Sequence, residues 1–184
     1  MYLLLYGYLP TTRDLATLKS KVIENRCFPA GLTDILEKIP KGAHPMDVLR
    51  TATSFMGNVE PEGRDHKQED IAIRLSALLG PIMLYWYHFH YSNTRISPHT
   101  GHDDNIARNF VKLLFRTEKP DEFAVRVVDI SLILYAEHDF NASTFVARAT
   151  ASTLSDLYSA LTAAIGTLRG PLHGGANEAA MEFL

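Results

Sequence analysis

The chain has 184 residues, of which 46% are hydrophobic and 21% are charged, and this ordinary globular mixture excludes a disordered, collagen-like or coiled-coil chain. The formal net charge of −3 gives no basic surface for nucleic acid or for an anionic membrane, so we expect neither partner. Cys27 is the only cysteine, which excludes an intrachain disulfide and multi-cysteine metal centres and favours a reducing, cytoplasmic location.

Helical periodicity dominates the chain, and the first half carries four short predicted helices. The apolar run 1–6 is helix-like but stops at Gly7 and is too short to span a membrane, which takes about 20 apolar residues. Further helices are predicted over 12–25, 34–39 and 45–55, the last with proline in its first turn.

Three longer segments then place apolar residues along one face of a helix. The spacing predicts helices over 71–89, 123–138 and 153–168. Their stripes consist of Ile71, Leu75, Leu78, Ile82, Tyr85 and Phe89; of Phe123, Val127, Ile130, Leu134 and His138; and of Leu154, Leu157, Leu161, Ile165 and Leu168. We interpret these faces as core rather than interface. The polar segments 57–68 and 92–104 are predicted loops, and strand patterns are scarce, so the predicted fold is all-α.

Neither end of the sequence has a helix boundary. Met1 leads into an apolar segment without a Ser, Thr, Asp or Asn cap. Residues 177–184 have the pattern of the first turns of an amphipathic helix, with no stop signal. We therefore expect the chain to be truncated at both ends.

Common catalytic and metal-binding motifs are absent from the sequence. His88 and His90 are two residues apart and point away from each other on a helix, and His99 and His102 have no cysteine nearby. We interpret these four as surface or hydrogen-bonded histidines and expect no metal site. Phosphate-loop, dinucleotide-binding and nucleophile-elbow patterns do not occur.

Two short segments remain as candidates for chemistry. The first runs from Tyr135 to Ser143 and places His138 in a group of polar residues that is unusual for a core, although a hydrogen-bonded core histidine is the alternative. The second runs from Gly170 to Glu178, where glycines flank His173 and allow close backbone approach. The helix predicted after His173 favours a neutral imidazole that donates a hydrogen bond. From these features alone, a structural turn and a functional turn are equally favoured.

Both segments resemble signatures of the citrate synthase family. The stretch Gly-Pro-Leu-His-Gly-Gly-Ala-Asn-Glu at 170–178 resembles the family's segment with a catalytic histidine, and Tyr135 to Phe145 resembles its oxaloacetate-binding region. Shorter similarities run along the chain, for example His-Pro-Met-Asp-Val-Leu-Arg-Thr at 44–51. The tyrosine at position 135 resembles the form of this segment in the 2-methylcitrate synthase branch of the family. Leu172 differs from that branch, which often has lysine at this position.

The resemblance implies a fold, a reaction and roles for three residues. It implies that residues 1–184 form part of a large helical domain, without the small domain and its remaining catalytic residues. The implied reaction condenses propionyl-CoA with oxaloacetate and water, giving 2-methylcitrate and CoA in propionate catabolism. His173 would stabilise the enolate that forms when the acyl group of the thioester loses a proton, and His138 and Asn141 would bind oxaloacetate. The family further implies a homodimer, no cofactor apart from the coenzyme A thioester substrate, and no turnover by this chain alone.

Two other functions remain open. A citrate synthase acting on acetyl-CoA differs by one methylene in the substrate, which a pocket distinguishes by only about 1–3 kcal/mol. A non-catalytic helical dimerisation module would retain the helices without using the histidines.

Overall fold

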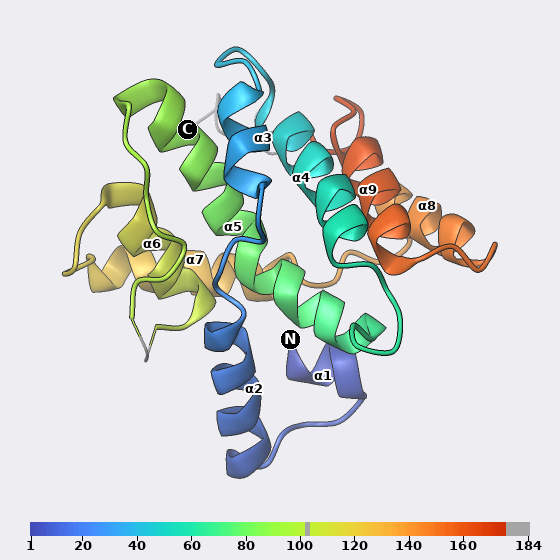
Figure 1. Ribbon diagram of the computed structural model, residues 1–184. Helices are drawn as coiled ribbons and strands as arrows, with labels where there is room; N and C mark the ends of the chain where they lie inside the picture. The colour runs from blue at the N-terminus through green and yellow to red at the C-terminus, as the bar shows by residue number, and fades with distance from the viewer. Residues whose placement is uncertain (102–103, 176–184) are drawn as a thin grey trace. The chain divides into compact units, whose positions relative to one another are not determined.

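The computed structural model describes residues 1–101 and 104–175, and these residues form helices without a strand (Figure 1). The all-α prediction is thus confirmed. The chain divides into two compact units: one of residues 1–28 and 69–138, the other of residues 29–68 and the described residues from 139 onward. Among the described residues, no helix combines the length and the apolar character needed to cross a membrane.

The first unit is built from five helices of the described chain. They are α1 (Tyr2–Tyr6), α2 (Thr12–Glu24), α5 (Gln68–Ser92), α6 (Ile106–Phe115) and α7 (Glu122–Leu134). Thr11 begins α2 through a capping box with Asp14, in which each residue bonds the backbone N–H of the other. Helices α2 and α5 share a core of Leu18, Val22, Ile73 and Ala77. A second core, of Ala107, Val111 and Val125, joins α6 and α7.

Helix α5 confirms the first predicted stripe. The stripe residues lie in the core, except for Phe89, which is partly buried. The helix extends a few residues beyond the predicted 71–89 at both ends, and it includes Pro81 without ending there.

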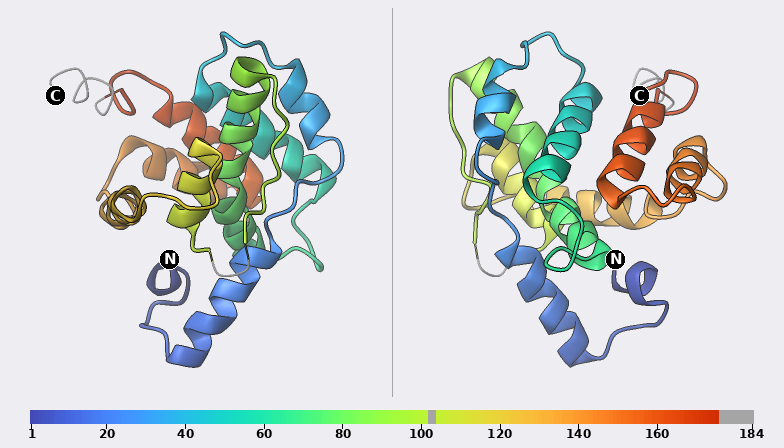
Figure 2. Two further views of the ribbon diagram at one scale, coloured as in Figure 1. Left: turned by 90° about the vertical axis from the view of Figure 1, so that its left-hand side faces the viewer. Right: turned by 45° about the vertical axis from the view of Figure 1, so that its right-hand side comes forward.

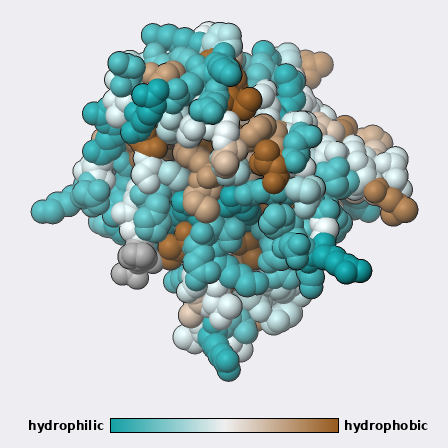
Figure 3. Space-filling view, viewed as in Figure 1, coloured by the Kyte–Doolittle hydropathy of each residue, from teal (hydrophilic) through white to brown (hydrophobic). Residues whose placement is uncertain are grey.

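Helix α7 contradicts the second predicted stripe. It ends at Leu134, so His138 lies beyond the helix. The side chains of Phe123 and Leu134 are 74% and 72% exposed, and Val125 is the buried residue of this helix. Hydrophobic side chains are also exposed elsewhere in the described chain, between hydrophilic ones (Figure 3). Periodicity identified an apolar face correctly but could not show whether anything covers it.

The second unit contains the helices that position the candidate site. They are α3 (Leu32–Lys38), α4 (Pro45–Val59), α8 (Ala142–Ala151) and α9 (Leu157–Leu168). Helix α9 packs against both α4 and α8, as the three views show (Figures 1 and 2). The buried residues of this unit include Leu32, Leu36, Val48, Ala52, Met56 and Tyr158.

The third predicted stripe is also corrected. Helix α9 begins at Leu157, because Asp156 accepts the backbone N–H of Ser159 and caps the helix there. Leu154 lies before this cap with a positive φ of 62° and is 96% exposed. The buried residues of α9 are Tyr158 and Ala160, neither of which belongs to the predicted stripe.

Two helices, α6 and α8, were not among the predicted elements. Each begins behind an asparagine whose side-chain oxygen accepts a backbone N–H from the first turn: Asn105 binds Arg108, and Asn141 binds Thr144. Both helices are short and follow polar segments, which hid their periodicity. The helix predicted from residue 177 lies outside the described residues.

The crossing of α4 and α9 depends on Gly57. A Cβ atom there would lie 2.8 Å from Tyr158 Cβ, whereas a Cβ at Gly166 of α9 would meet only Arg50 Cδ at 3.6 Å, an ordinary contact. Gly57→Ala is therefore expected to lower the free energy of unfolding by about 1–3 kcal/mol through overpacking. Gly166→Ala is the matched control and should raise it by about 0.5–1 kcal/mol through helix propensity. Urea denaturation measures both, and equal effects would contradict the close crossing.

Candidate active site

His173 lies in a tight turn that follows α9. The turn is held by main-chain hydrogen bonds: Gly170 N–H donates to Thr167 O, and both His173 N–H and Gly174 N–H donate to Gly170 O, at 3.0 and 2.9 Å for the last two. Because the carbonyl of Gly170 accepts both bonds, residues 170–174 form a closed turn that contains His173. The imidazole is therefore attached to a short segment with little conformational freedom.

Glycine is required at Gly174 because the backbone approaches α9 closely. A Cβ atom at this position would lie 1.8 Å from the carbonyl oxygen of Leu168, where no side chain fits. A Cβ at Gly175 would lie 2.7 Å from the carbonyl oxygen of Pro171. The glycines that flank His173 thus allow this turn to pack against the end of the helix.

The ring of His173 is oriented by the first turn of α8. Its Nε2 accepts a hydrogen bond from the backbone N–H of Ser143 at 3.3 Å and lies 3.0 Å from Ser143 Oγ. A backbone amide can only donate, so the amide contact fits a ring proton on Nδ1, whereas the shorter Oγ contact fits a proton on Nε2, because the Ser143 hydroxyl donates to Asn141. In the first of these tautomers His173 is a neutral imidazole whose Nδ1–H can donate a hydrogen bond.

Asn141 supports this arrangement from the N-cap of α8. Its Oδ1 accepts the backbone N–H of Thr144 and the hydroxyl of Ser143, both at 2.7 Å. One amide oxygen therefore caps the helix and holds the residue that contacts His173. The sequence placed Asn141 and Ser143 in the same polar segment but gave Ser143 no role; its position two residues after an asparagine N-cap was the available signal.

The structure assigns the two predicted histidines to different units. His173, Asn141 and Ser143 belong to the second unit, whereas His138 is the last residue of the first unit's second segment and is exposed. Asn141 is connected to His173 through Ser143, a connection that the sequence did not predict. The oxaloacetate-binding roles of His138 and Asn141 remain predictions.

Charged side chains at the start of the turn connect it to α4. Arg169 caps the C-terminus of α9, and its Nε lies 3.4 Å from Oδ2 of Asp47. Arg50 Nη2 lies 3.0 Å from the other oxygen of the same carboxylate. Two cations therefore share one anion, and all three side chains are partly exposed, so the pairs add little stability.

The described residues contain no group of three or more His, Cys, Asp or Glu side chains that could hold a metal ion. His88 is buried, with Nε2 2.9 Å from the carbonyl oxygen of Leu113, which fits its interpretation as a hydrogen-bonded histidine. His102 lies outside the described residues.

A family model matches the whole length of the sequence. The family model described as "Citrate synthase, C-terminal domain" matches residues 1–184. The chain therefore belongs to the citrate synthase family.

Individual relatives carry two related names. A 2-methylcitrate synthase from Shewanella oneidensis is 54% identical over 183 residues, which cover 100% of this chain and 48% of that protein. A citrate synthase from Deinococcus radiodurans is 42% identical over 98% of this chain and 48% of its own length. The chain thus spans about half the length of the curated relatives it matches.

Solved structures agree with the fold. The crystal structure of citrate synthase from Thermotoga maritima has a TM-score of 0.85 and 36% identity, covering 99% of this chain and 47% of that one. Citrate synthase from Thermoplasma acidophilum, solved as a ternary complex with carboxymethyl coenzyme A and oxaloacetate, has a TM-score of 0.85 and 31% identity over 98% of this chain and 47% of its own.

Replacing Asn141 tests the connection between α8 and His173. Asn141→Ala removes the N-cap and should lower the free energy of unfolding by about 1 kcal/mol. It should also change the ¹⁵N shifts of the His173 ring, because Ser143 loses its anchor. Asn105→Ala is the matched control: it removes the equivalent cap of α6 at a similar cost and should leave these shifts unchanged. Unaltered His173 shifts in Asn141→Ala would contradict the connection.

Proposed function

We propose that this chain forms part of the active site of an enzyme that condenses propionyl-CoA with oxaloacetate and water to give 2-methylcitrate and CoA. The observation that carries the proposal is His173, whose imidazole is held by Ser143 in the turn after α9. The 54% identity to a 2-methylcitrate synthase supports the choice of propionyl-CoA.

In this reaction His173 acts on the acyl group. Loss of an α-proton from the thioester puts negative charge on the carbonyl oxygen, and a neutral Nδ1–H donor stabilises that oxygen more as the charge develops. In the proposed state the Ser143 amide donates to Nε2, so that the ring proton lies on Nδ1, and the contacts with Ser143 fix the orientation of the ring. An exposed, untethered imidazole would exchange its proton between the two nitrogens.

His138 and Asn141 are the proposed contacts for oxaloacetate. Both follow α7 in the segment that resembles the family's oxaloacetate-binding region. A relative in the same fold has been solved with oxaloacetate and a coenzyme A derivative bound. We further propose that the protein is a cytoplasmic homodimer and needs no cofactor other than its coenzyme A thioester substrate.

Acetyl-CoA is the second candidate substrate, because the relatives include citrate synthases of 42–43% identity. The difference of one methylene can be set by few side chains. A dimerisation module without activity is the third possibility. It does not require the ordered bond between His173 and Ser143.

Chimeric enzymes test the acyl specificity. This chain would replace the matching half of the Shewanella oneidensis 2-methylcitrate synthase and, separately, of the Deinococcus radiodurans citrate synthase. We expect release of CoA from both, and in the second chimera a shift of kcat/KM toward propionyl-CoA of about 5-fold or more. Because this chain matches about half of each relative, it should release no CoA on its own. Turnover by the chain alone would contradict the expectation that it is inactive on its own. An unshifted preference for acetyl-CoA in the second chimera would contradict the proposed specificity for propionyl-CoA.

A further inference from the structure

A cleft of about 160 Å³ lies between α1 and α2 in the first unit. The residues that line it are Tyr2 and Tyr6 of α1 and Asp14, Thr17, Leu18 and Lys21 of α2. Within each helix these residues are spaced so that they share one face. A cavity of about 150 Å³ holds a molecule of benzene, so the cleft can take a ligand of about that size.

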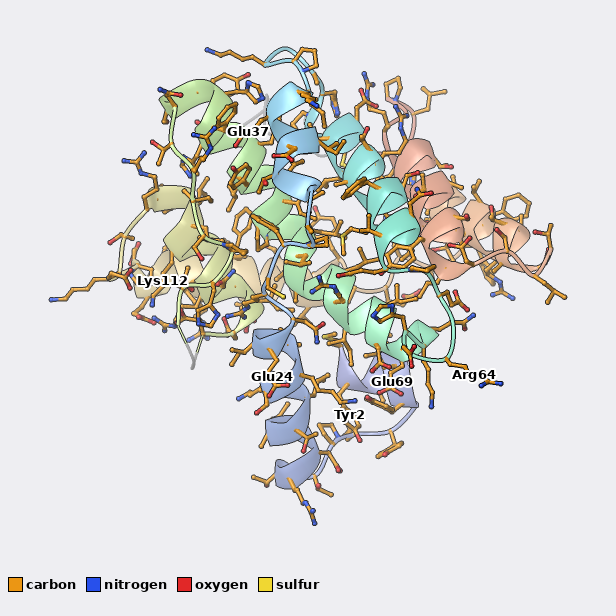
Figure 4. All side chains as sticks on the ribbon, viewed as in Figure 1. Tyr2, Glu24, Glu37, Arg64, Glu69 and Lys112 are labelled. Carbon is orange, nitrogen blue, oxygen red and sulfur yellow. The ribbon has the colours of Figure 1, made fainter. Side chains whose placement is uncertain are left out.

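Aromatic rings form one wall of the cleft. The ring centroids of Tyr2 and Tyr6 lie 4.4 Å apart, and Tyr8 packs edge-on against Tyr2 at 5.5 Å. The hydroxyl of Tyr2 donates to that of Tyr8 at 2.9 Å, and the hydroxyl of Tyr6 donates to Glu69 of α5 (Figure 4). Leu18, which is buried, adds an apolar surface from α2. The two lining rings are therefore held in place by bonds at their hydroxyls.

Charged side chains around the cleft leave one negative charge in excess. Asp14 lines the cleft, and Glu69 and Asp70 stand in the first turn of α5. Lys21 lies between the last two, with Nζ 3.5 Å from Glu69 and 4.0 Å from Asp70. Arg13, whose charge acts on Asp14, is the other cation of this group. Two positive charges thus face three negative ones.

The same carboxylates raise the pKa values of the two lining tyrosines. The hydrogen bond with Glu69 is the main cause that raises the pKa of Tyr6 to about 12, and burial and the charges of Glu69 and Asp70 add to it. The pKa of Tyr2 is raised by its bond with Tyr8, then by burial and by the charge of Asp14. Both phenols are therefore neutral at pH 7, and the field at their rings favours a cation.

We propose that this cleft binds a small organic cation with a quaternary ammonium group. Tyrosine ring faces attract such a cation, and its methyl groups can pack against Leu18. A primary ammonium fits less well, because its three N–H groups need acceptors and Oε1 of Glu69 already serves Tyr6 and Lys21. The site belongs to the first unit and does not depend on the reaction proposed for His173.

Choline and a neutral analogue test the site in the wild-type chain. The analogue is the alcohol in which a tert-butyl group replaces the trimethylammonium group, so that the shape is kept and the charge is removed. Titration followed by the amide NMR shifts of α1 and α2, at constant ionic strength, gives both dissociation constants. We expect choline to bind about 10-fold more tightly, from its attraction to the rings and carboxylates. Equal affinities, or no shifts with choline, would overturn the proposal.

Variants locate the cation within the cleft. Tyr6→Leu removes one ring but keeps an apolar side chain, and it should abolish the preference for choline over the alcohol. Tyr91→Leu is the matched control, because Tyr91 is an exposed tyrosine of α5 outside the cleft, and it should retain the preference. Lys21→Met removes the lining cation and should tighten choline binding by about 2-fold or more. Weaker binding to Lys21→Met would contradict the assigned sign of charge.

Intermolecular NOEs cover the case in which Tyr6→Leu does not fold. The methyl protons of choline bound to the wild-type chain should show NOEs to the ring protons of Tyr2 and Tyr6. NOEs only to rings outside the cleft, such as that of Tyr91, would overturn the site whatever the variants do.

Discussion

Replacing His173 by alanine in either chimeric enzyme is expected to lower kcat by about 10²–10⁴-fold. In the proposed reaction the imidazole donates a hydrogen bond to the enolate oxygen, and alanine removes this donor. The overall fold should persist, because His173 is partly exposed and lies after the last residue of α9. Release of CoA measures kcat, and circular dichroism measures the helical content.

Leu172 supplies the matched control for this prediction. It is the neighbouring residue of the same turn, and its side chain is fully exposed. Leu172→Ala should therefore leave kcat within about 2-fold of the parent, since surface substitutions away from special features have small effects. Unchanged turnover in His173→Ala would favour the non-catalytic module instead.

Gly174→Ala is expected to reduce kcat by at least about 10²-fold while every catalytic side chain is retained. Its Cβ would lie 1.8 Å from the carbonyl oxygen of Leu168, so the turn must move away from α9. Displacing a catalytic group by about 1 Å can cost this much in rate. The contact between His173 Nε2 and Ser143 should be lost together with the rate, and the ¹⁵N shifts of the ring should report it.

Gly42→Ala distinguishes this steric effect from a general effect of adding methyl groups at glycines. Gly42 is exposed, and a Cβ there would meet nothing within 4 Å. This variant should match the parent in both rate and His173 shifts. A Gly174→Ala enzyme as active as Gly42→Ala would show that the turn tolerates displacement.

Local sequence pattern predicted the described helices other than α6 and α8, but it did not predict what packs against each helix. The stripe of α5 is buried as expected, while the equally regular stripe of α7 is largely exposed. Both obey the same 3.6-residue period, which depends only on the helix itself. Burial depends on what packs against the face, and no single segment encodes that.

The features of the candidate site that depend on residue type alone could be predicted from the sequence. Glycines around His173 indicated close backbone approach, and the structure places Gly174 against Leu168. The role of Ser143 could not be predicted, because it depends on a contact between residues 30 positions apart in sequence. The sequence predicted that a helix following His173 would act on its ring, whereas in the described structure the ring contacts the amide and hydroxyl of Ser143.

Because one oxygen of Asn141 both caps α8 and holds Ser143, the orientation of the His173 ring is sensitive to fraying of α8. When the first turn of this helix opens, the Ser143 amide no longer faces Nε2, and the ring is released to rotate and to exchange its proton. Helix ends open far more readily than cores. Heating is therefore expected to release the His173 ring before the helices separate, and in the proposed enzyme activity would be lost at a lower temperature than helical structure.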